Sequence, residues 1–244
     1  MSSRFASMRD ALNKTGKPIF FSLAKSDLSE IASIGANISN SWRSSIKVLD
    51  AWQNVRSSFQ VNNYYAANQT TGFFNDPDFL SIGIKQLSSQ EERSQFALWA
   101  IAKAPLLISA NLTSITPNSL AILKNRNLIR INQDPTSNQA QCIFNCLGDV
   151  QVFGAPQDTL QPTGKNYYAA VAINWNDISV KGITVDFRLI KDVVCKGCAS
   201  AQDVQCDVFD LWQNFPIGTY KNIFTVPAMQ PHASEAYKLT CKYL

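Results

Sequence analysis

The chain has 244 residues, of which 45% are hydrophobic and 16% are charged, and its net charge is +4. This composition is sufficient for a buried core and excludes a disordered polyelectrolyte. No run approaches the length of a membrane-spanning helix, and no Lys/Arg cluster marks a nucleic-acid-binding face. We therefore expect one large or two modest globular domains, with no membrane span and no nucleic-acid partner.

The first predicted elements alternate between helix and strand. Apolar residues at helical spacing predict a helix over residues 4–15, and a short buried strand follows at residues 17–23. Residues 27–34 are predicted to form a turn or a short helix. A second short strand at residues 38–43 and a helix over residues 46–59 come next. This order is typical of successive strand–helix units.

The alternation continues through the next stretch. Ser89 and Glu92 have the spacing of a capping box, which predicts the start of another helix. Residues 105–109 form a continuous apolar run, typical of a strand in a parallel sheet covered on both faces. A helix over residues 117–126 and a strand over residues 128–131 follow. Strands that alternate with helices predict a parallel α/β arrangement for the first half of the chain.

The pattern changes near residue 134. Short alternating runs then dominate, at residues 150–153, 167–174, 182–187, 206–211 and 236–243. Runs of this kind separated by turn residues predict an antiparallel β-sandwich. The charge balance also changes, from 14 Lys/Arg against 8 Asp/Glu (+6) over residues 1–133 to 8 against 10 (−2) over residues 134–244. We therefore predict two domains, residues 1–133 and residues 134–244.

All the cysteines lie in the second part of the chain. They are Cys142, Cys146, Cys195, Cys198, Cys206 and Cys241. An even number confined to one region favours disulfides, although the sequence does not choose among the possible pairings. A zinc site is the alternative, because Cys195 and Cys198 have the spacing of half a zinc ribbon. The second half of such a ribbon has no counterpart in the sequence, so disulfides are the favoured prediction.

Four Asn-x-Ser/Thr sequons are candidates for N-glycosylation. They are Asn13, Asn37, Asn68 and Asn111. Together with the cysteines they favour a secreted, lysosomal, vacuolar or other endomembrane lumen. The first residues, however, lack the apolar core of a signal peptide. Two interpretations stay open: a cytosolic protein with unused sequons, or the back part of a longer precursor.

Five segments, in this order, carry a resemblance to a known family. They are Met8–Ser22, Asn40–Arg43, Gly72–Gly83, Ala97–Ile108 and Ile131–Pro135. Asp207–Trp212 with Gly218, and later Pro231-His232, match the same family's C-terminal β-domain. Together these segments resemble the second half of the α-galactosidase / α-N-acetylgalactosaminidase family (glycoside hydrolase family 27, clan D).

The resemblance implies a (β/α)8 barrel followed by an antiparallel β-domain. Only the back half of the barrel, about strands five to eight, would be present in residues 1–133. A barrel closes to remove its strand edges, so half of one leaves an open parallel sheet. We therefore expect another chain or segment to supply the N-terminal half, within a larger complex or a homo-oligomer. We expect neither a cofactor nor a metal.

The resemblance also locates the catalytic groups. Retaining glycosidases use two carboxylates about 5 Å apart, one as nucleophile and one as acid/base. The family's nucleophile would lie upstream of Met8, and its acid/base four residues after Arg43, where this chain has Lys47. A protonated lysine is a poor acid for a glycosidic oxygen. Asp50 could replace it only through a register shift, so we expect no intact catalytic residue.

The sugar pocket implied by the resemblance is also altered. Lys25 and Ser26 stand where the family has a glutamate and an aromatic residue, and each lost hydrogen bond to a sugar hydroxyl costs about 1–3 kcal/mol. The remaining pocket residues are Trp42, Arg43, Asp76 and Asp78. Arg43 would bind the 2-substituent of the sugar, and Asp78 would line the wall. A structural role, with Arg43 paired to a nearby carboxylate, is the favoured alternative.

Three functional hypotheses follow. The first is a catalytically inactive α-galactosidase-like protein that serves as a structural or interaction subunit. The second is the C-terminal part of an active retaining α-galactosidase that hydrolyses terminal α-galactosides. The third and weakest is a carbohydrate-binding module that uses the remnant pocket or the β-domain.

Overall fold

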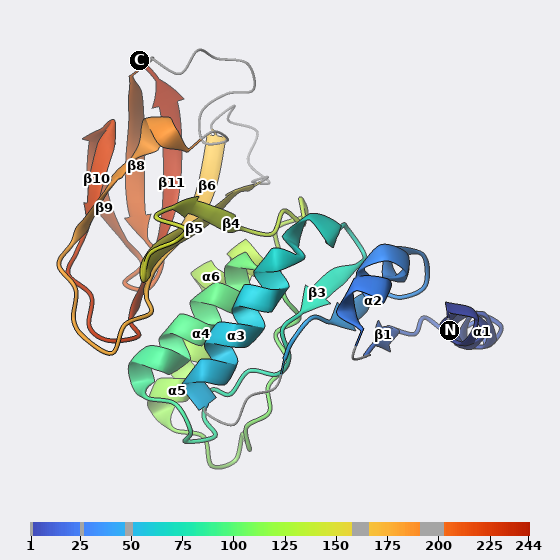
Figure 1. The fold of residues 1–244 in the computed structure, drawn as a ribbon. Helices are drawn as coiled ribbons and strands as arrows, with labels where there is room; N and C mark the ends of the chain where they lie inside the picture. Colours follow the sequence, from blue (N-terminus) through green and yellow to red (C-terminus); the bar gives the residue numbers. More distant parts are fainter. Residues whose placement is uncertain (1, 25–26, 47–50, 158–165, 191–202) are drawn as a thin grey trace.

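The computed structural model describes residues 2–24, 27–46, 51–157, 166–190 and 203–244. Figure 1 shows the N-terminal helix α1 (Ser2–Asn13) at one end of the molecule and a large β-sheet at the other, with a group of helices between them. Among the described residues, no helix combines the length and the apolar character that crossing a bilayer requires.

The first part of the chain is a small parallel sheet with helices. Its strands pair in the order β1 (Ser22–Leu23), β2 (Ser41–Arg43) and β3 (Phe74–Asp76). The other helices are α2 (Leu28–Ile34), α3 (Ala51–Tyr64), α4 (Ser89–Ile101), α5 (Pro117–Leu123) and α6 (Arg126–Asn132), with one-turn 3-10 helices η1 (Gly35–Asn37) and η2 (Ala66–Asn68). The order of elements agrees with the predicted strand–helix series from α1 to α4, except that strand β3 was not predicted.

The second part is antiparallel. Its strands are β4 (Gln141–Phe144), β5 (Val150–Gln157), β6 (Asn166–Asn174), β7 (Ile183–Asp186), β8 (Val204–Asp210), β9 (Phe215–Lys221), β10 (Ile223–Val226) and β11 (Ser234–Tyr243). Six of them form one sheet in the order β4-β5-β6-β11-β8-β9, and β7 pairs with β10, next to the 3-10 helix η3 (Phe187–Leu189). The predicted runs correspond to β5, β6, β7, β8 and β11, whereas β4, β9 and β10 were not predicted.

The central strand β6 contributes to two cores. Successive side chains of a strand point to opposite faces, and both faces of β6 are buried. Toward the helices it contributes Ala169, Val171 and Ile173. Toward the β7–β10 pair it contributes Tyr168, Ala170 and Ala172. The sheet is therefore the middle layer, with helices on one face and a second sheet on the other.

Helix α4 is the element that joins the two parts. All its residues from Phe96 to Ile101 are buried, and they share one core with β5, β6 and β11. The capping box that begins α4 is formed by Ser88 and Glu91, one residue before the predicted pair. Glu92 is instead buried and accepts hydrogen bonds from the Gly83 N–H (2.7 Å) and the Ser119 hydroxyl (2.7 Å). The predicted division at residues 133 and 134 stays a prediction, and this core crosses it.

The predicted strand at residues 128–131 is wrong, because this segment is helix α6. Asn125 caps the helix with its side chain, which accepts a hydrogen bond from the Leu128 N–H. Leu128, Ile131 and Asn132 are buried, which is the i, i+3, i+4 spacing of one helical face. An apolar run this short fits a strand or a buried helical turn equally well, and packing against α4 decides for the helix.

Two further predicted strands are shorter and more exposed than expected. Within residues 17–23 only Ser22–Leu23 is strand, and Phe20 is 63% exposed. Within residues 105–109 the ladder is reduced to a single parallel bridge between Leu80 and Ile108, and Ile108 is 44% exposed. Both segments lie at the open edges of the small parallel sheet, where no other described strand covers them.

His232 lies where the helices meet the β-sheet. Its ring stacks on Trp52 with centroids 4.6 Å apart, and its two ring nitrogens lie 2.7 Å from a Glu91 oxygen and 2.8 Å from an Asp177 oxygen. The backbone carbonyl of His232 also accepts a hydrogen bond from the Ser94 hydroxyl. These contacts connect α4 with the segment before β11, so His232 has a structural role at this junction.

Two disulfides are present among the described residues. One joins Cys142 and Cys146, and the other joins Cys206 of β8 to Cys241 of β11 across directly paired positions. The prediction of disulfides rather than zinc is confirmed for these four cysteines. Cys195 and Cys198 lie outside the described residues.

We predict that the two disulfides differ in their contribution to stability. Cys206 and Cys241 are 35 residues apart, whereas Cys142 and Cys146 are only 4 apart. Loop-closure entropy gives about 4 kcal/mol for the longer loop and about 2 kcal/mol for the shorter one. The Cys206→Ala/Cys241→Ala variant should therefore lose more free energy of unfolding in urea than the Cys142→Ala/Cys146→Ala variant. Equal losses, or the reverse order, would contradict this.

Candidate functional site

The candidate site lies at the carboxyl ends of β2 and β3. Arg43 and Asp76 are the last residues of these strands and are directly paired in the parallel register, and Asp78 follows two residues later. Carboxyl ends of parallel strands meet at one edge of the sheet, which is where α/β proteins place ligands. The structure therefore brings together three of the residues that the sequence predicts.

Trp42 lies one position before Arg43 and is fully buried. Its indole N–H donates to the Asn75 side-chain oxygen at 2.7 Å, and its ring meets Tyr65 edge to face at 5.2 Å. Strand alternation directs Trp42 and Asn75 to the face opposite Arg43 and Asp76. Trp42 thus packs in a small core on the face of the sheet opposite the site, and this core holds β2 in place.

Arg43 and Asp78 form an ion pair at the open side of the site. The guanidinium nitrogen lies 3.6 Å from the Asp78 carboxylate, and the two side chains are 55% and 34% exposed. Such an exposed pair contributes only about 0–1 kcal/mol, so a ligand can compete for either group. Asp78 has a φ of +83°, and its carbonyl accepts the Trp99 indole N–H at 2.8 Å. The fold therefore holds Asp78 in an uncommon backbone conformation at this edge.

Asp76 is the buried carboxyl group of the site. Its oxygen accepts the backbone N–H of Asp78 at 3.0 Å. Its pKa is raised to about 6, chiefly by burial and also by the nearby Asp78 charge, although the Asp78 N–H and the Arg43 charge act to lower it. A carboxyl group with this pKa can hold a proton in weakly acidic solution and donate it to an acceptor.

Several predicted site residues lie outside the described residues. They are Lys25, Ser26, Lys47 and Asp50. The four sequon asparagines are all in described segments and are all exposed, as an attached glycan requires. In the part of the chain that the structure describes, His, Cys, Asp and Glu side chains form no group of three that could hold a metal ion.

A buried network of side-chain amides was not predicted. The backbone N–H of Asn75 donates to the side-chain oxygen of Gln69 (3.1 Å), and the side-chain amide of Asn75 donates to the side-chain oxygen of Gln139 (3.0 Å). Gln139 in turn donates to the side chain of Asn62, which donates to the Ser44 hydroxyl. Asn75 belongs to a matched segment, but Asn62, Gln69 and Gln139 do not, and Gln139 lies 64 residues after Asn75. Only the fold brings them together.

We predict that Asp76→Asn makes the protein more stable near neutral pH. Because the pKa of Asp76 rises from 3.8 to about 6 on folding, the folded state binds the proton more tightly. The associated stability is present below about pH 4 and is lost as the pH rises to about 6. Asp76→Asn removes this pH-dependent decrease in the free energy of unfolding, which amounts to about 3 kcal/mol at most near neutral pH.

Urea unfolding at about pH 4 and about pH 7 measures the effect. The substituted asparagine would retain an acceptor oxygen for the Asp78 N–H, so the local geometry should persist. Asp149→Asn, at an exposed position remote from the site, is the matched control and should not change the pH dependence. An Asp76→Asn variant whose stability follows pH as in the wild type would show that folding does not raise the pKa of Asp76.

Comparison with known proteins gives matches along the chain. A family model described as "Alpha galactosidase A" matches residues 1–134. Alpha-galactosidase 3 of Arabidopsis thaliana is 39% identical over 140 residues, which are 57% of this chain and 32% of that protein. Alpha-galactosidase 2 of the same plant is 30% identical over 237 residues, or 97% of this chain and 56% of that protein. The chain thus spans about a third to just over half of these relatives.

A solved structure supports the fold. The crystal structure of alpha-galactosidase I from Mortierella vinacea matches 97% of this chain and 62% of its own chain, with a TM-score of 0.84 at 24% identity. The similarity confirms the predicted fold class, the second half of a (β/α)8 barrel followed by an antiparallel β-sandwich.

Proposed function

Since the chain belongs to the alpha-galactosidase family of glycoside hydrolases, we propose that it is a catalytically inactive member that serves as a structural or interaction subunit. The observation that carries the proposal is Lys47. It stands four residues after Arg43, where the family resemblance puts the acid/base carboxylate. An ammonium group cannot alternate between acid and base at neutral pH as a retaining mechanism requires.

The sugar-binding side of the site supports the same proposal. Lys25 and Ser26 replace the glutamate and the aromatic residue that the resemblance implies. The groups that remain at the carboxyl ends of β2 and β3 already bind one another, because Arg43 pairs with Asp78 and Asp76 accepts the Asp78 N–H. Mutual pairing explains why these residues are present without a catalytic use.

The open edges of the parallel sheet support a partner. Strand β1 pairs with β2 on one side, and no described strand pairs with its other side. Large apolar side chains are exposed around the two open edges, namely Ile19 (43%), Phe20 (63%), Leu107 (47%) and Ile108 (44%). Unpaired edges with exposed apolar residues favour association. We propose that another chain or segment with the N-terminal half of the barrel covers them, in a larger complex or a homo-oligomer.

The compartment that we propose is an oxidising lumen. Two described disulfides and four exposed sequon asparagines support a secreted, lysosomal, vacuolar or other endomembrane location. Such a location suits a glycoprotein, and glycans at exposed positions would leave the core intact.

A second candidate function is the C-terminal part of an active retaining α-galactosidase. The observation that favours it is the retention of Arg43, Asp76 and Asp78 as one cluster, in which Asp76 has a pKa of about 6 and can hold a proton. In that case a segment with strands one to four would supply the nucleophile. Asp50 would then be the candidate acid/base, and the substrates would be terminal α-galactosides.

We predict that the chain, with its natural neighbour, does not hydrolyse a chromogenic α-galactoside. Lys47→Asp should raise turnover by about 100-fold or more over the wild-type complex, which is the scale of general acid–base catalysis. Lys47→Ala is the matched control, because it removes the ammonium group without adding a carboxylate. Turnover in the wild type that disappears in Asp50→Asn or Asp78→Asn would overturn the inactive assignment and support the second function.

We also predict that Phe20→Asp weakens the association. Native mass measurement of the protein from its source should show a species heavier than the 27.1 kDa chain. A charge at this exposed edge residue should shift that species toward the free chain, because a buried unpaired carboxylate is costly. Leu147→Asp, at a fully exposed position in the turn between β4 and β5, is the control and should have no effect. A monodisperse monomer with a cooperative melt would rule out the partner.

A further inference from the structure

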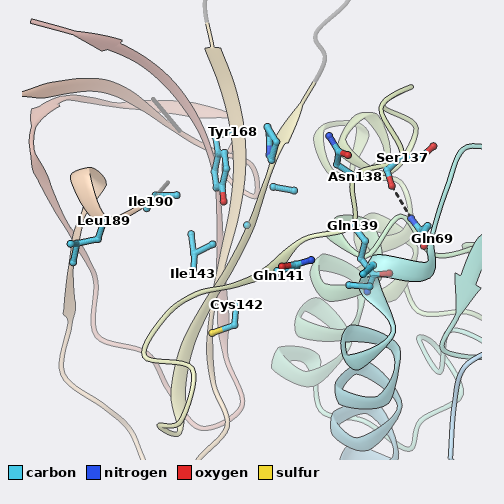
Figure 2. Close-up of a pocket in the computed structure, with 15 residues that line it drawn as sticks. Gln69, Ser137, Asn138, Gln139, Gln141, Cys142, Ile143, Tyr168, Leu189 and Ile190 are labelled. Carbon is cyan, nitrogen blue, oxygen red and sulfur yellow. Dashed lines mark hydrogen bonds between the residues drawn. The ribbon is translucent and has the colours of Figure 1, made fainter. Parts of the chain in front are cut away.

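A pocket of about 690 Å³ lies at the junction between the helical part and the large β-sheet. Figure 2 shows Gln69 and the loop that carries Ser137 and Gln139 on one side of it, and Tyr168, Ile143 and Ile190 on the other. None of its described lining residues belongs to the Arg43–Asp76–Asp78 site. The pocket is therefore a second concave feature of the chain.

The lining has the chemistry of a site for a neutral polar ligand. Its polar side chains are carboxamides and hydroxyls, namely Gln69, Asn138, Gln139, Gln141, Ser137 and Tyr168. None of the described lining residues is charged, so an ionic ligand would be desolvated without a compensating partner. Apolar side chains, among them Ile143 and Ile190, complete the wall. A carbohydrate combines hydroxyl groups with apolar C–H faces and matches both kinds of surface.

Two of the carboxamides are fixed by the fold. Gln69 accepts the Asn75 N–H (3.1 Å) and donates to the Ser137 carbonyl (3.2 Å), a bond that Figure 2 draws. Gln139 is held by Asn62 on one side and by Asn75 on the other. Both glutamines are buried, so the pocket wall is rigid before any ligand arrives. Preorganisation of this kind reduces the entropy lost on binding.

The two other carboxamides are available to a ligand. Asn138 and Gln141 are exposed, and no hydrogen bond of either side chain is present among the described contacts. Asn138 lies in the short segment that connects α6 to β4, and Gln141 is the first residue of β4, so the two stand on either side of buried Gln139 and Ala140. Their amides can both donate and accept, which is what binding of vicinal hydroxyl groups requires.

Gly154 of β5 gives the floor of the pocket its shape. A Cβ atom at this position would lie 2.4 Å from the Tyr168 ring and 2.9 Å from the Ala169 carbonyl oxygen. The absence of a side chain thus lets the aromatic ring of Tyr168 pack directly against β5. The Tyr168 ring itself is only 2% exposed, so the apolar surface that a ligand can reach is that of the partly buried Ile143 and of Leu189, which is 65% exposed.

We propose that this pocket binds a neutral mono- or disaccharide, separately from the remnant of the barrel site. Asn138 and Gln141 contact the sugar hydroxyls, and Ile143 and Leu189 contact its apolar face. The fixed glutamines also connect the pocket to Asn75, whose side chain accepts the Trp42 indole N–H. A bound sugar should therefore change the environment of the Trp42 indole N–H.

The test is a titration of the full chain with galactose, glucose and lactose, followed by saturation-transfer NMR and by the indole N–H resonances. Saturable binding with a dissociation constant of about 1 mM is expected, with a shift of the Trp42 resonance. Asn138→Ala/Gln141→Ala should weaken binding at least about tenfold, because two ligand hydrogen bonds are removed. Gln213→Ala, at an exposed carboxamide in the β8–β9 turn, is the matched control and should bind as the wild type does.

The variants also separate this pocket from the barrel remnant. Arg43→Ala should leave the sugar affinity unchanged, and thermal melts should show that every variant is folded. Loss of binding in Arg43→Ala but not in Asn138→Ala/Gln141→Ala would overturn the proposal, as would the lack of saturable binding for all three sugars. Binding of galactose 1-phosphate as tight as that of galactose would contradict a neutral site. The inactive assignment is judged by turnover alone, so the two proposals fail independently.

Discussion

The packing of α4 onto the six-stranded sheet is the contact on which the rest of the structure depends. Every residue of α4 from Phe96 to Ile101 is buried, and the same core contains residues of β5, β6 and β11. One helix thus belongs to the partial barrel and covers the β-sheet at the same time. Because half of a barrel cannot close on itself, this shared core, with the His232 contacts at its rim, supplies burial that a separate half-barrel would lack.

The second determinant is the amide network around Asn75. It runs from Trp42, beneath the Arg43–Asp76–Asp78 site, to Gln69 and Gln139, which line the pocket between the helical part and the large β-sheet. Buried polar groups need partners, and here each member satisfies the next, so that the network fixes the positions of β2, β3 and the segment after α6 relative to one another. This gives a structural reason for a chain to keep the Asn-Asp-Pro-Asp segment whether or not it performs hydrolysis.

The barrel site combines retained and altered chemistry. Arg43, Asp76 and Asp78 are assembled where family resemblance expects a sugar, whereas Lys47 stands four residues after Arg43, where that resemblance expects the acid/base carboxylate. Because one fold hosts both interaction subunits and enzymes, the proposed assignment depends on the residues of the site and not on the fold. The open edge near Phe20 and the exposed run at Leu107–Ile108 are what make a second polypeptide segment the central expectation.

The sequence by itself determined the family, the two kinds of sheet and the three polar residues of the barrel site, because these depend on local motifs and on short periodic runs. It did not determine α6, since residues 128–131, three of them apolar, fit either a strand or a helix until α4 packs against them. Nor did it indicate the lengths of the strands at residues 17–23 and 105–109, because pairing depends on neighbours outside each run. Only the tertiary structure could bring Gln139 to Asn62 and Asn75, which lie 77 and 64 residues away, because a hydrogen-bonded network between distant residues leaves no periodic trace along the chain.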